Sequence, residues 1–244
     1  MKCIILAAGY ATRLYPLTEN TAKPLLEVGN KTILDHIIKK IEKIDDIDDI
    51  YIVTNEKFYS SFVRWRFKNY KGSKHVVVMN DKTTSNDNRL GAIKDIQYVI
   101  DEAGIHDDLM VLAGDNLFEF ELTEFVDYYQ HVKADCITTH ELTELDELQG
   151  SGVIEVDHEM KVTAFEEKPE EPKSNLAVPP FYIYQKDTIP LLEQYLEEGN
   201  NPDAPGNFIP WLIQLKEMYA FKFEGLRYDI GTPESYEKVQ KLFE

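Results

Sequence analysis

Residues 2–14 have the sequence KCIILAAGYATRL, an apolar run that ends at Gly9 and continues as a polar turn. The run from Lys2 to Ala7 has the length and composition of a buried strand. Residues 32–44 then place five isoleucines and one leucine at helical spacing, with lysines and a glutamate outside that stripe, which predicts an amphipathic helix. Ile50 to Thr54 is typical of a second strand. This succession of strand, helix and strand indicates an α/β sheet.

The same alternation continues along most of the chain. We therefore predict a Rossmann-like, three-layer α/β/α fold with a mixed, mostly parallel central sheet. Without a Gly/Ser linker or an internal repeat, residues 1–244 are interpreted as one domain whose pieces become shorter and richer in strands after about residue 140. Further strands are expected at 75–79, 109–113, 135–139, 152–156, 161–165, 181–184 and 218–223, and further helices at 57–69, 90–103, 122–132, 186–198 and 233–243.

Charge and cysteine content exclude several classes of protein. With 26 Lys and Arg against 44 Asp and Glu, the net charge of −18 argues against a partner that is a nucleic acid or an anionic membrane. Cys3 and Cys136 cannot form a disulfide framework, and no apolar segment approaches the roughly 20 residues of a membrane span. A cytoplasmic protein is expected, and a homo-oligomer is left open.

One glycine and two cations follow the first strand. Gly9 allows close approach of the backbone to a ligand, and Arg13 and Lys23 are cations suited to a polyphosphate. Loops at the carboxyl ends of parallel strands are where open α/β sheets bind ligands. The segment is neither a Walker motif nor a dinucleotide fingerprint, and a surface loop with a structural arginine and a solvated lysine explains these residues equally well on spacing alone.

Two aspartates occupy comparable positions. Asp115 follows the expected strand 109–113 directly, and Asp229 comes just before the expected helix 233–243. Because Mg²⁺ binds through one or two carboxylates and fills its other positions with phosphate oxygens and water, the two aspartates are candidate metal ligands if both face one cleft. Taken singly, each is an ordinary acidic loop residue.

Four ordered segments resemble the nucleotidyltransferases that make nucleotide sugars from nucleoside triphosphates and sugar 1-phosphates, glucose-1-phosphate thymidylyltransferase in particular. The first segment joins Leu6-Ala7-Ala8-Gly9 and Thr12-Arg13-Leu14 to Lys23-Pro24. The others lie at 111–116, 165–175 and 228–236, so the resemblance spans nearly the whole chain. It implies the nucleotide-diphospho-sugar transferase type of fold, with residues 1–140 as the nucleotide-binding part and 141–244 as the sugar-phosphate-binding part.

The resemblance also implies roles for individual residues. Arg13 and Lys23 would be catalytic, offsetting charge on the triphosphate and on the departing pyrophosphate, and Asp115 and Asp229 would hold Mg²⁺ or Mn²⁺. Lys168 would hold the sugar phosphate, and Glu167 would accept hydrogen bonds from sugar hydroxyls. The remaining candidates are Leu6, Ala8, Gly9, Asn80 and Gly114 for the nucleotide and Gly152 for the sugar phosphate.

The substrate-reading segments depart from the thymidylyltransferase pattern. Residues 80–93 lack its Gln-Pro segment and look more like the corresponding part of phosphocholine-type cytidylyltransferases, and Pro179-Pro180 replaces a usual Thr-Gly. The overall resemblance favours dTTP or UTP with glucose 1-phosphate, and because of these departures we retain a cytidylyl- or guanylyltransferase acting on another sugar or polyol phosphate. A non-catalytic nucleotide-sugar sensor is the alternative of another class. The aromatic cluster of Phe58, Tyr59, Phe62, Trp65 and Phe67 is expected to be mostly a core face rather than a partner surface, with Phe62, Trp65 and, one turn back, Tyr59 packing on the sheet.

Overall fold

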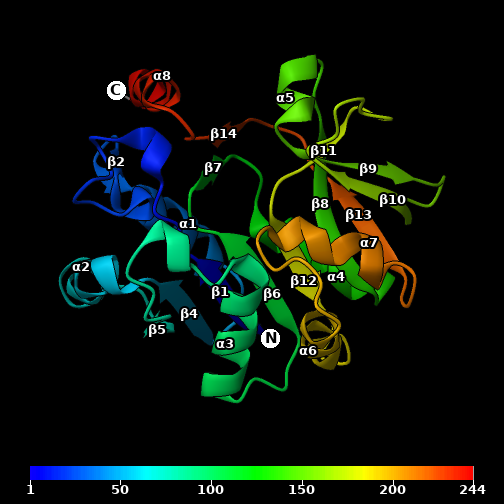
Figure 1. Cartoon of the computed structure of the whole chain (residues 1–244), viewed down its shortest axis with the longest axis horizontal. Coiled ribbons are helices and arrows are strands. Elements are labelled where there is room, and N and C mark those ends of the chain that lie inside the picture. Colours follow the sequence, from blue (N-terminus) through cyan, green and yellow to red (C-terminus); the bar gives the residue numbers. More distant parts are fainter. Residues whose placement is uncertain (244) are drawn as a thin grey trace. The chain divides into compact units, whose positions relative to one another are not determined.

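The computed structural model describes residues 1–243 (Figure 1), and the contacts among them divide the chain into two compact units. Each unit is built from segments that lie far apart in the sequence. The first unit contains residues 1–90, 113–123 and 225 onward, and the second contains residues 91–112 and 124–224.

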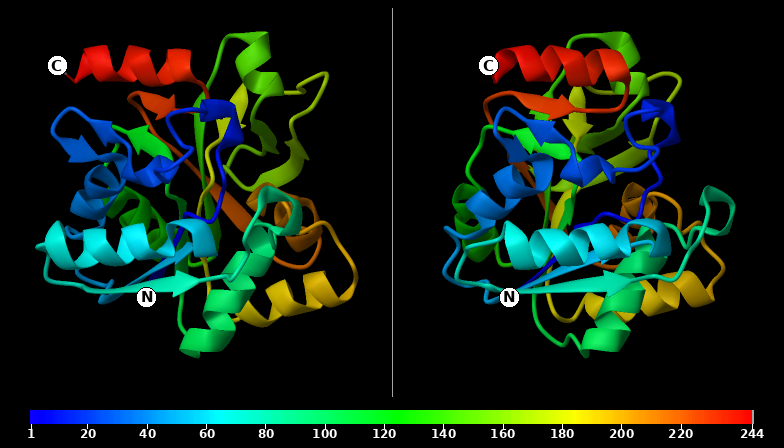
Figure 2. Two further views of the ribbon diagram at one scale, coloured as in Figure 1. Left: turned by 60° about the vertical axis from the view of Figure 1, so that its left-hand side comes forward. Right: turned by 90° about the vertical axis from the view of Figure 1, so that its left-hand side faces the viewer.

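Three parallel strands form the sheet of the first unit, in the order β1-β4-β5, with Cys3 opposite Ile50 and Ile50 opposite Val76. A short antiparallel pair, β7 and β14, places Asn116 opposite Asp229. Both views of Figure 2 show α2 running along β5 and α8 next to β14. The elements are β1 (Lys2–Leu6), β2 (Glu27–Val28), β3 (Lys31–Thr32), α1 (Ile33–Ile41), β4 (Asp49–Thr54), α2 (Glu56–Lys68), β5 (His75–Asn80), β7 (Asn116–Phe118), β14 (Arg227–Asp229) and α8 (Pro233–Leu242).

Helix α1 forms where the isoleucine stripe predicts it. Thr32 caps its N-terminus, since its hydroxyl accepts a hydrogen bond from the Asp35 amide while the Asp35 carboxylate accepts one from the Thr32 amide. The apolar stripe is fully buried, and each of its side chains contributes about 1.5–3 kcal/mol by leaving water. It consists of Ile33, Leu34, Ile37, Ile38 and Ile41.

Helix α2 buries the predicted aromatic stripe. Phe58, Phe62 and Trp65 are almost completely buried, which confirms that most of the predicted cluster belongs to the core, whereas Tyr59 is only half-buried. The Trp65 indole donates a 2.9 Å hydrogen bond to Asp35, which joins α2 to α1. Phe67, on the opposite face, is exposed.

The sheet of the second unit is mixed. Its strands follow the order β10-β9-β11-β8-β12-β6, and β13 pairs with β8 in parallel. Strands β6, β8, β9 and β13 run in one direction, and β10, β11 and β12 in the other. The elements are α3 (Ala92–Ala103), β6 (Leu109–Ala113), α4 (Leu122–Val132), β8 (Asp135–Glu141), α5 (Leu145–Gln149), β9 (Gly152–Val156), β10 (Val162–Glu167), β11 (Leu176–Val178), β12 (Phe181–Tyr184), α6 (Ile189–Glu197), α7 (Ile209–Leu212) and β13 (Met218–Lys222).

These elements confirm the α/β prediction, because helices and strands alternate, the sheet β1-β4-β5 is parallel and the sheet of the second unit is mixed. Every strand and helix predicted from the apolar pattern is present, with ends that differ by up to three residues. Helix α6 begins at Ile189, later than predicted, with Pro190 in its first turn, where the missing amide hydrogen is tolerated. The pattern missed the short elements β2, β3, β7, β11, β14, α5 and α7, which are too brief to show a periodicity. Among residues 1–243, no helix has the length and apolar character needed to span a bilayer.

Candidate active site

The loop that follows β1 is fastened to the neighbouring elements at several points. The Ala7 amide donates to the Val53 carbonyl, and the buried Asn55 side chain donates to the Ala8 carbonyl over 2.8 Å. The Asn55 carbonyl oxygen also caps α2 by accepting a hydrogen bond from the Phe58 amide. One buried amide side chain therefore holds both the first loop and the start of α2.

Ala11 turns the loop toward the residues that carry charge. It has a left-handed backbone, with φ of 48°, and its carbonyl accepts hydrogen bonds from the Leu14 amide and the Thr18 hydroxyl. Glycine adopts this conformation more readily than alanine.

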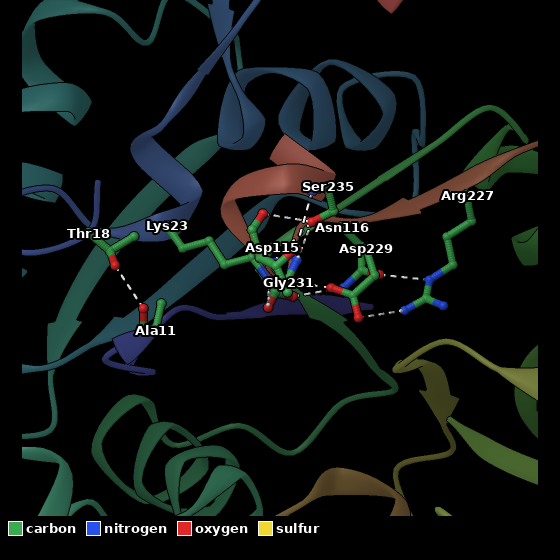
Figure 3. Close-up of polar contacts among 10 residues, drawn as sticks. Ala11, Thr18, Lys23, Asp115, Asn116, Arg227, Asp229, Gly231 and Ser235 are labelled. Carbon is green, nitrogen blue, oxygen red and sulfur yellow. Dashed lines mark hydrogen bonds and ion pairs between the residues drawn. The ribbon is translucent and has the colours of Figure 1, made fainter. Parts of the chain in front are cut away.

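Lys23 lies between the two predicted metal ligands (Figure 3). Its ammonium is 2.7 Å from Oδ2 of Asp115 and 3.4 Å from Oδ1 of Asp229, and its side chain is 9% exposed. The carboxylates are more open, with side chains that are 38% and 54% exposed. The structure therefore brings together three residues that stand 92 and 206 positions apart in the chain.

Two further residues close these contacts into a ring. Asn116 donates to Oδ1 of Asp115 over 2.7 Å and accepts a 2.7 Å hydrogen bond from Nε of Arg227. The Arg227 guanidinium also lies 3.7 Å from Oδ2 of Asp229. Each carboxylate thus has one oxygen facing Lys23 and the other held from the far side.

The charges around Asp115 stabilise its ionised form. Burial opposes ionisation, but the Lys23 ammonium, the Arg227 charge and the Asn116 amide outweigh it and hold the pKa of Asp115 below its usual range. The carboxylate is therefore ionised near neutral pH, as a metal ligand must be.

A cavity of ≈ 130 Å³ opens beside this ring, within the first unit. Five of the predicted site residues line it. The lining includes the loop that follows β1 and the segment before α8. Its lining is Leu6, Ala7, Gly9, Ala11, Arg13, Leu14, Lys23, Pro24, Asp115 and Gly231. A side chain built at Gly9 would meet no atom within 4 Å, so this glycine leaves room in the cavity and is not needed for packing.

The other nucleotide candidates have structural contacts instead of a place in that lining. Gly114 packs closely, because a Cβ there would lie 2.9 Å from the Leu6 carbonyl oxygen, to which the Gly114 amide donates. Ala8 is buried, and its carbonyl accepts the hydrogen bond from Asn55. The Asn80 amide donates to Glu56 and accepts from the Lys82 amide. Their nucleotide-binding roles stay predictions.

The sugar-phosphate candidates all lie in the second unit. Glu167 is directly opposite Gly152 in the β9–β10 pair, and Lys168 follows β10 with φ of 51°, its amide donating to the Ser151 carbonyl. Burial raises the pKa of Glu167 above its usual range and outweighs the opposite effect of the well-exposed Lys168 ammonium, 3.9 Å away. Gly152 and Gly206 both pack against Glu167 and Phe165, so small residues make room for this carboxylate.

The two aspartates suit a hard divalent cation. Their carboxylates converge on one cation already, the Lys23 ammonium, and Mg²⁺ or Mn²⁺ accepts two carboxylates together with phosphate oxygens and water. Within residues 1–243, no cluster of three or more His, Cys, Asp or Glu is arranged for a metal. Asp115 and Asp229 would therefore need the substrate to complete the ligand set.

The family model for nucleotidyl transferases matches residues 2–244. The chain belongs to this family. A nucleotidyltransferase fold also follows from the solved structures: a chain assigned as a glucose-1-phosphate thymidylyltransferase from Bacillus anthracis, in complex with sucrose, aligns with a TM-score of 0.82 and 25% identity over 100% of this chain and 95% of that one. A UDP-glucose pyrophosphorylase in complex with UDP-glucose shares the fold, with a TM-score of 0.81 and 23% identity over 99% of this chain and 97% of that one.

Curated relatives of this nucleotidyltransferase chain are longer proteins. Bifunctional protein GlmU of Methanocaldococcus jannaschii is 31% identical over 233 residues, which are 96% of this chain and 52% of that protein. Glucose-1-phosphate adenylyltransferase of Geobacillus stearothermophilus is 31% identical over an alignment of 255 positions, gaps included, that covers 96% of this chain and 64% of that protein. The chain thus spans about half to two thirds of the length of these relatives. The resemblance to sugar-phosphate nucleotidyltransferases is confirmed.

Sequence reasoning missed three residues that organise this nucleotidyltransferase site. Asn116 directly follows Asp115, and Arg227 stands two positions before Asp229 on β14, the spacing that puts two side chains on one face of a strand. The positions of these two residues relative to the aspartates were the sequence signals that could have identified them. Asn55 offered a different one, as an asparagine between a strand and a helix in the usual capping position.

Proposed function

We propose that this protein transfers a nucleoside monophosphate from a nucleoside triphosphate to a sugar 1-phosphate, forming a nucleotide sugar. A phosphate oxygen of the sugar 1-phosphate attacks the α-phosphorus, the bond from that phosphorus to the β-phosphate bridging oxygen breaks, and pyrophosphate leaves. No covalent intermediate with the protein is required. The observation that carries the proposal is the convergence of Lys23, Asp115 and Asp229 beside a cavity lined by Gly9 and Arg13.

The chain's own residues supply positioning and charge. Arg13 and Lys23 bind the phosphates of the triphosphate. The planar Arg13 guanidinium can donate two parallel hydrogen bonds to a phosphate, and the Lys23 ammonium acts as a compact positive charge. Asp115 and Asp229 hold Mg²⁺ or Mn²⁺, which when bound neutralises charge on the phosphates. Because the reaction brings two polyanions together, fixed cations account for most of the expected rate enhancement.

The second unit is proposed to bind the sugar phosphate. Lys168 pairs with the phosphate and Glu167 accepts hydrogen bonds from sugar hydroxyls, with Gly152 leaving space beside it. Glucose 1-phosphate is the first substrate to test, because the names of the adenylyltransferase, thymidylyltransferase and UDP-glucose relatives share glucose. We favour dTTP or UTP as the nucleotide. Those names differ in the base, so ATP belongs in the test beside CTP and GTP.

The test is pyrophosphate release with Mg²⁺ for dTTP, UTP, CTP, GTP and ATP against glucose 1-phosphate and other sugar and polyol phosphates. Turnover with a restricted set of pairs, lost in Asp115→Asn, is the expected result. Nucleotide binding without turnover for any pair would overturn the enzyme proposal and favour a nucleotide-sugar sensor.

A further inference from the structure

Lys23 occupies the place that a metal ion needs. Its ammonium contacts one oxygen of Asp115 and one of Asp229, the two carboxylates proposed to hold the divalent cation. A metal ion bound to these same oxygens would stand within a few ångströms of the ammonium. Two cations that close, in a partly buried site, repel each other strongly. Lysine and metal therefore compete for the carboxylate pair.

The two cations would approach from different sides. The Lys23 side chain is 9% exposed and reaches the carboxylates from the buried turn before β2, whereas the carboxylates themselves are 38% and 54% exposed. Both Lys23 and Asp115 line the cavity. A hydrated metal ion can thus reach the carboxylates from solvent without crossing the core.

The carboxylates are held in place independently of Lys23. Asn116 fixes the second oxygen of Asp115, and Arg227 holds Asn116 and lies beside the second oxygen of Asp229. Removing the lysine therefore leaves a two-carboxylate cradle that is still supported on its far side. The flexible lysine stem, in contrast, can move its ammonium without moving the backbone.

We propose that Lys23 is the resident counter-cation of Asp115 and Asp229 and that a divalent metal ion exchanges with it, releasing its ammonium toward the phosphates of the nucleotide. The exchange itself follows from the contacts of Lys23 with the two aspartates. That the released ammonium then pairs with nucleotide phosphates rests on the proposed function. One side chain thereby links metal binding to phosphate binding. Without nucleotide, a metal ion must displace the Lys23 ammonium although no phosphate is present to pair with it, so the metal binds weakly. With nucleotide present, metal binding at the aspartates and phosphate binding by Lys23 favour each other.

The first experiment measures Mn²⁺ affinity by electron paramagnetic resonance on the full chain without nucleotide. Lys23→Gln should bind Mn²⁺ at least about tenfold more tightly than the native protein, because the competing cation is gone. Lys43→Gln removes the same charge from an exposed ion pair with Glu121 and should change the affinity less than about twofold. Equal affinity in Lys23→Gln and the native protein, or weaker binding in a folded Lys23→Gln, would overturn the proposal.

A second measurement uses the native protein and so does not depend on the variant folding. Reductive methylation, followed by peptide mass spectrometry, should modify Lys23 slowly without metal and several-fold faster with saturating Mn²⁺, while Lys43 reacts at one rate throughout. An unchanged rate at Lys23 would contradict displacement. Because neither readout involves turnover, failure of the exchange and failure of the proposed enzymatic activity give different patterns of results.

Discussion

The Arg227 guanidinium donates from Nε to Oδ1 of Asn116 over 2.7 Å, joining two residues that are 111 positions apart. Asn116 passes this constraint to Asp115, with which it shares a 2.7 Å hydrogen bond. The outer groups that orient Asp115, a proposed metal ligand, thus lie on the antiparallel pair β7–β14. Substitution of such groups typically lowers metal affinity or activity by about 10–100-fold.

Removing the Arg227 guanidinium should weaken the metal site without emptying it. Arg227→Met leaves the Asn116 oxygen without its donor, so we expect about 10–100-fold weaker Mn²⁺ activation of pyrophosphate release. Arg227→Lys should recover part of the loss, since lysine keeps the positive charge but not the planar guanidinium that contacts two residues at once. Titration of activity with Mn²⁺ checks this, with Lys43→Met as a matched surface control; identical metal dependence in Arg227→Met and native protein would contradict the positioning role.

The same substitution at two glycines should have opposite consequences. A methyl group at Gly9 meets no atom within 4 Å, so Gly9→Ala should change the free energy of unfolding by less than about 0.5 kcal/mol and yet lower activity, because the methyl enters the cavity. At Gly114 it would lie 2.9 Å from the Leu6 carbonyl oxygen, and Gly114→Ala should destabilise the fold by about 1–3 kcal/mol.

Urea unfolding and pyrophosphate release, measured on both variants, separate these effects. A destabilised Gly9→Ala would show that this glycine is structural. A native-like stability of Gly114→Ala would show that the loop can shift to accept a side chain.

Space beside Glu167 should control its proposed contact with the sugar. A Cβ at Gly206 would lie 2.4 Å from Oε2 of Glu167, so Gly206→Ala must displace that carboxylate or its neighbours. We expect the KM for the sugar 1-phosphate to rise by about tenfold while the KM for the nucleotide stays within about twofold. Gly150→Ala, whose new Cβ would find its nearest atoms at 3.5 Å, is the control. A parallel rise in both KM values would point to general damage.

The contact between Glu42 and Tyr70 should make stability depend on pH at both extremes. Burial alone would raise the pKa of Glu42, but the hydrogen bonds from Tyr70 and Ser73 lower it below its usual value of 4.5. The stabilisation is therefore present above pH 4.5 and is lost as the pH falls through the lower, folded-state pKa. Burial, followed by the bond to Glu42, raises the pKa of Tyr70 to about 12, so its share is present below pH 10 and is lost as the pH rises toward 12.

Urea unfolding of native protein and Tyr70→Phe at pH 3, 7 and 11 tests this contact. The stability difference should be largest at pH 7 and smaller at both ends. A difference that is the same at all three values would mean that the Tyr70–Glu42 bond does not depend on either charge.

Most of the local structure was predictable from sequence because it depends on neighbours along the chain. The isoleucine stripe of α1 and the aromatic stripe of α2 are buried as their spacing predicts. The apolar runs gave every long strand, since a buried strand needs only a few consecutive apolar residues bounded by turns. Three-residue pairs such as β7 and β14 carry no such signal and form because their partners are adjacent in space.

The sequence by itself determined the alternation of strands and helices, the acidic charge, and the family pattern in which Gly9, Arg13, Lys23, Asp115 and Asp229 stand at the ends of secondary-structure elements. Only the tertiary structure decided that Lys23 bridges both aspartates and that Asn116 and Arg227 hold them from behind. The physical reason is range. Helical and strand periodicity act over a few residues, whereas the contacts of Lys23 with both aspartates and of Arg227 with Asn116 form across about 90 to 200 positions and exist only once the chain has folded.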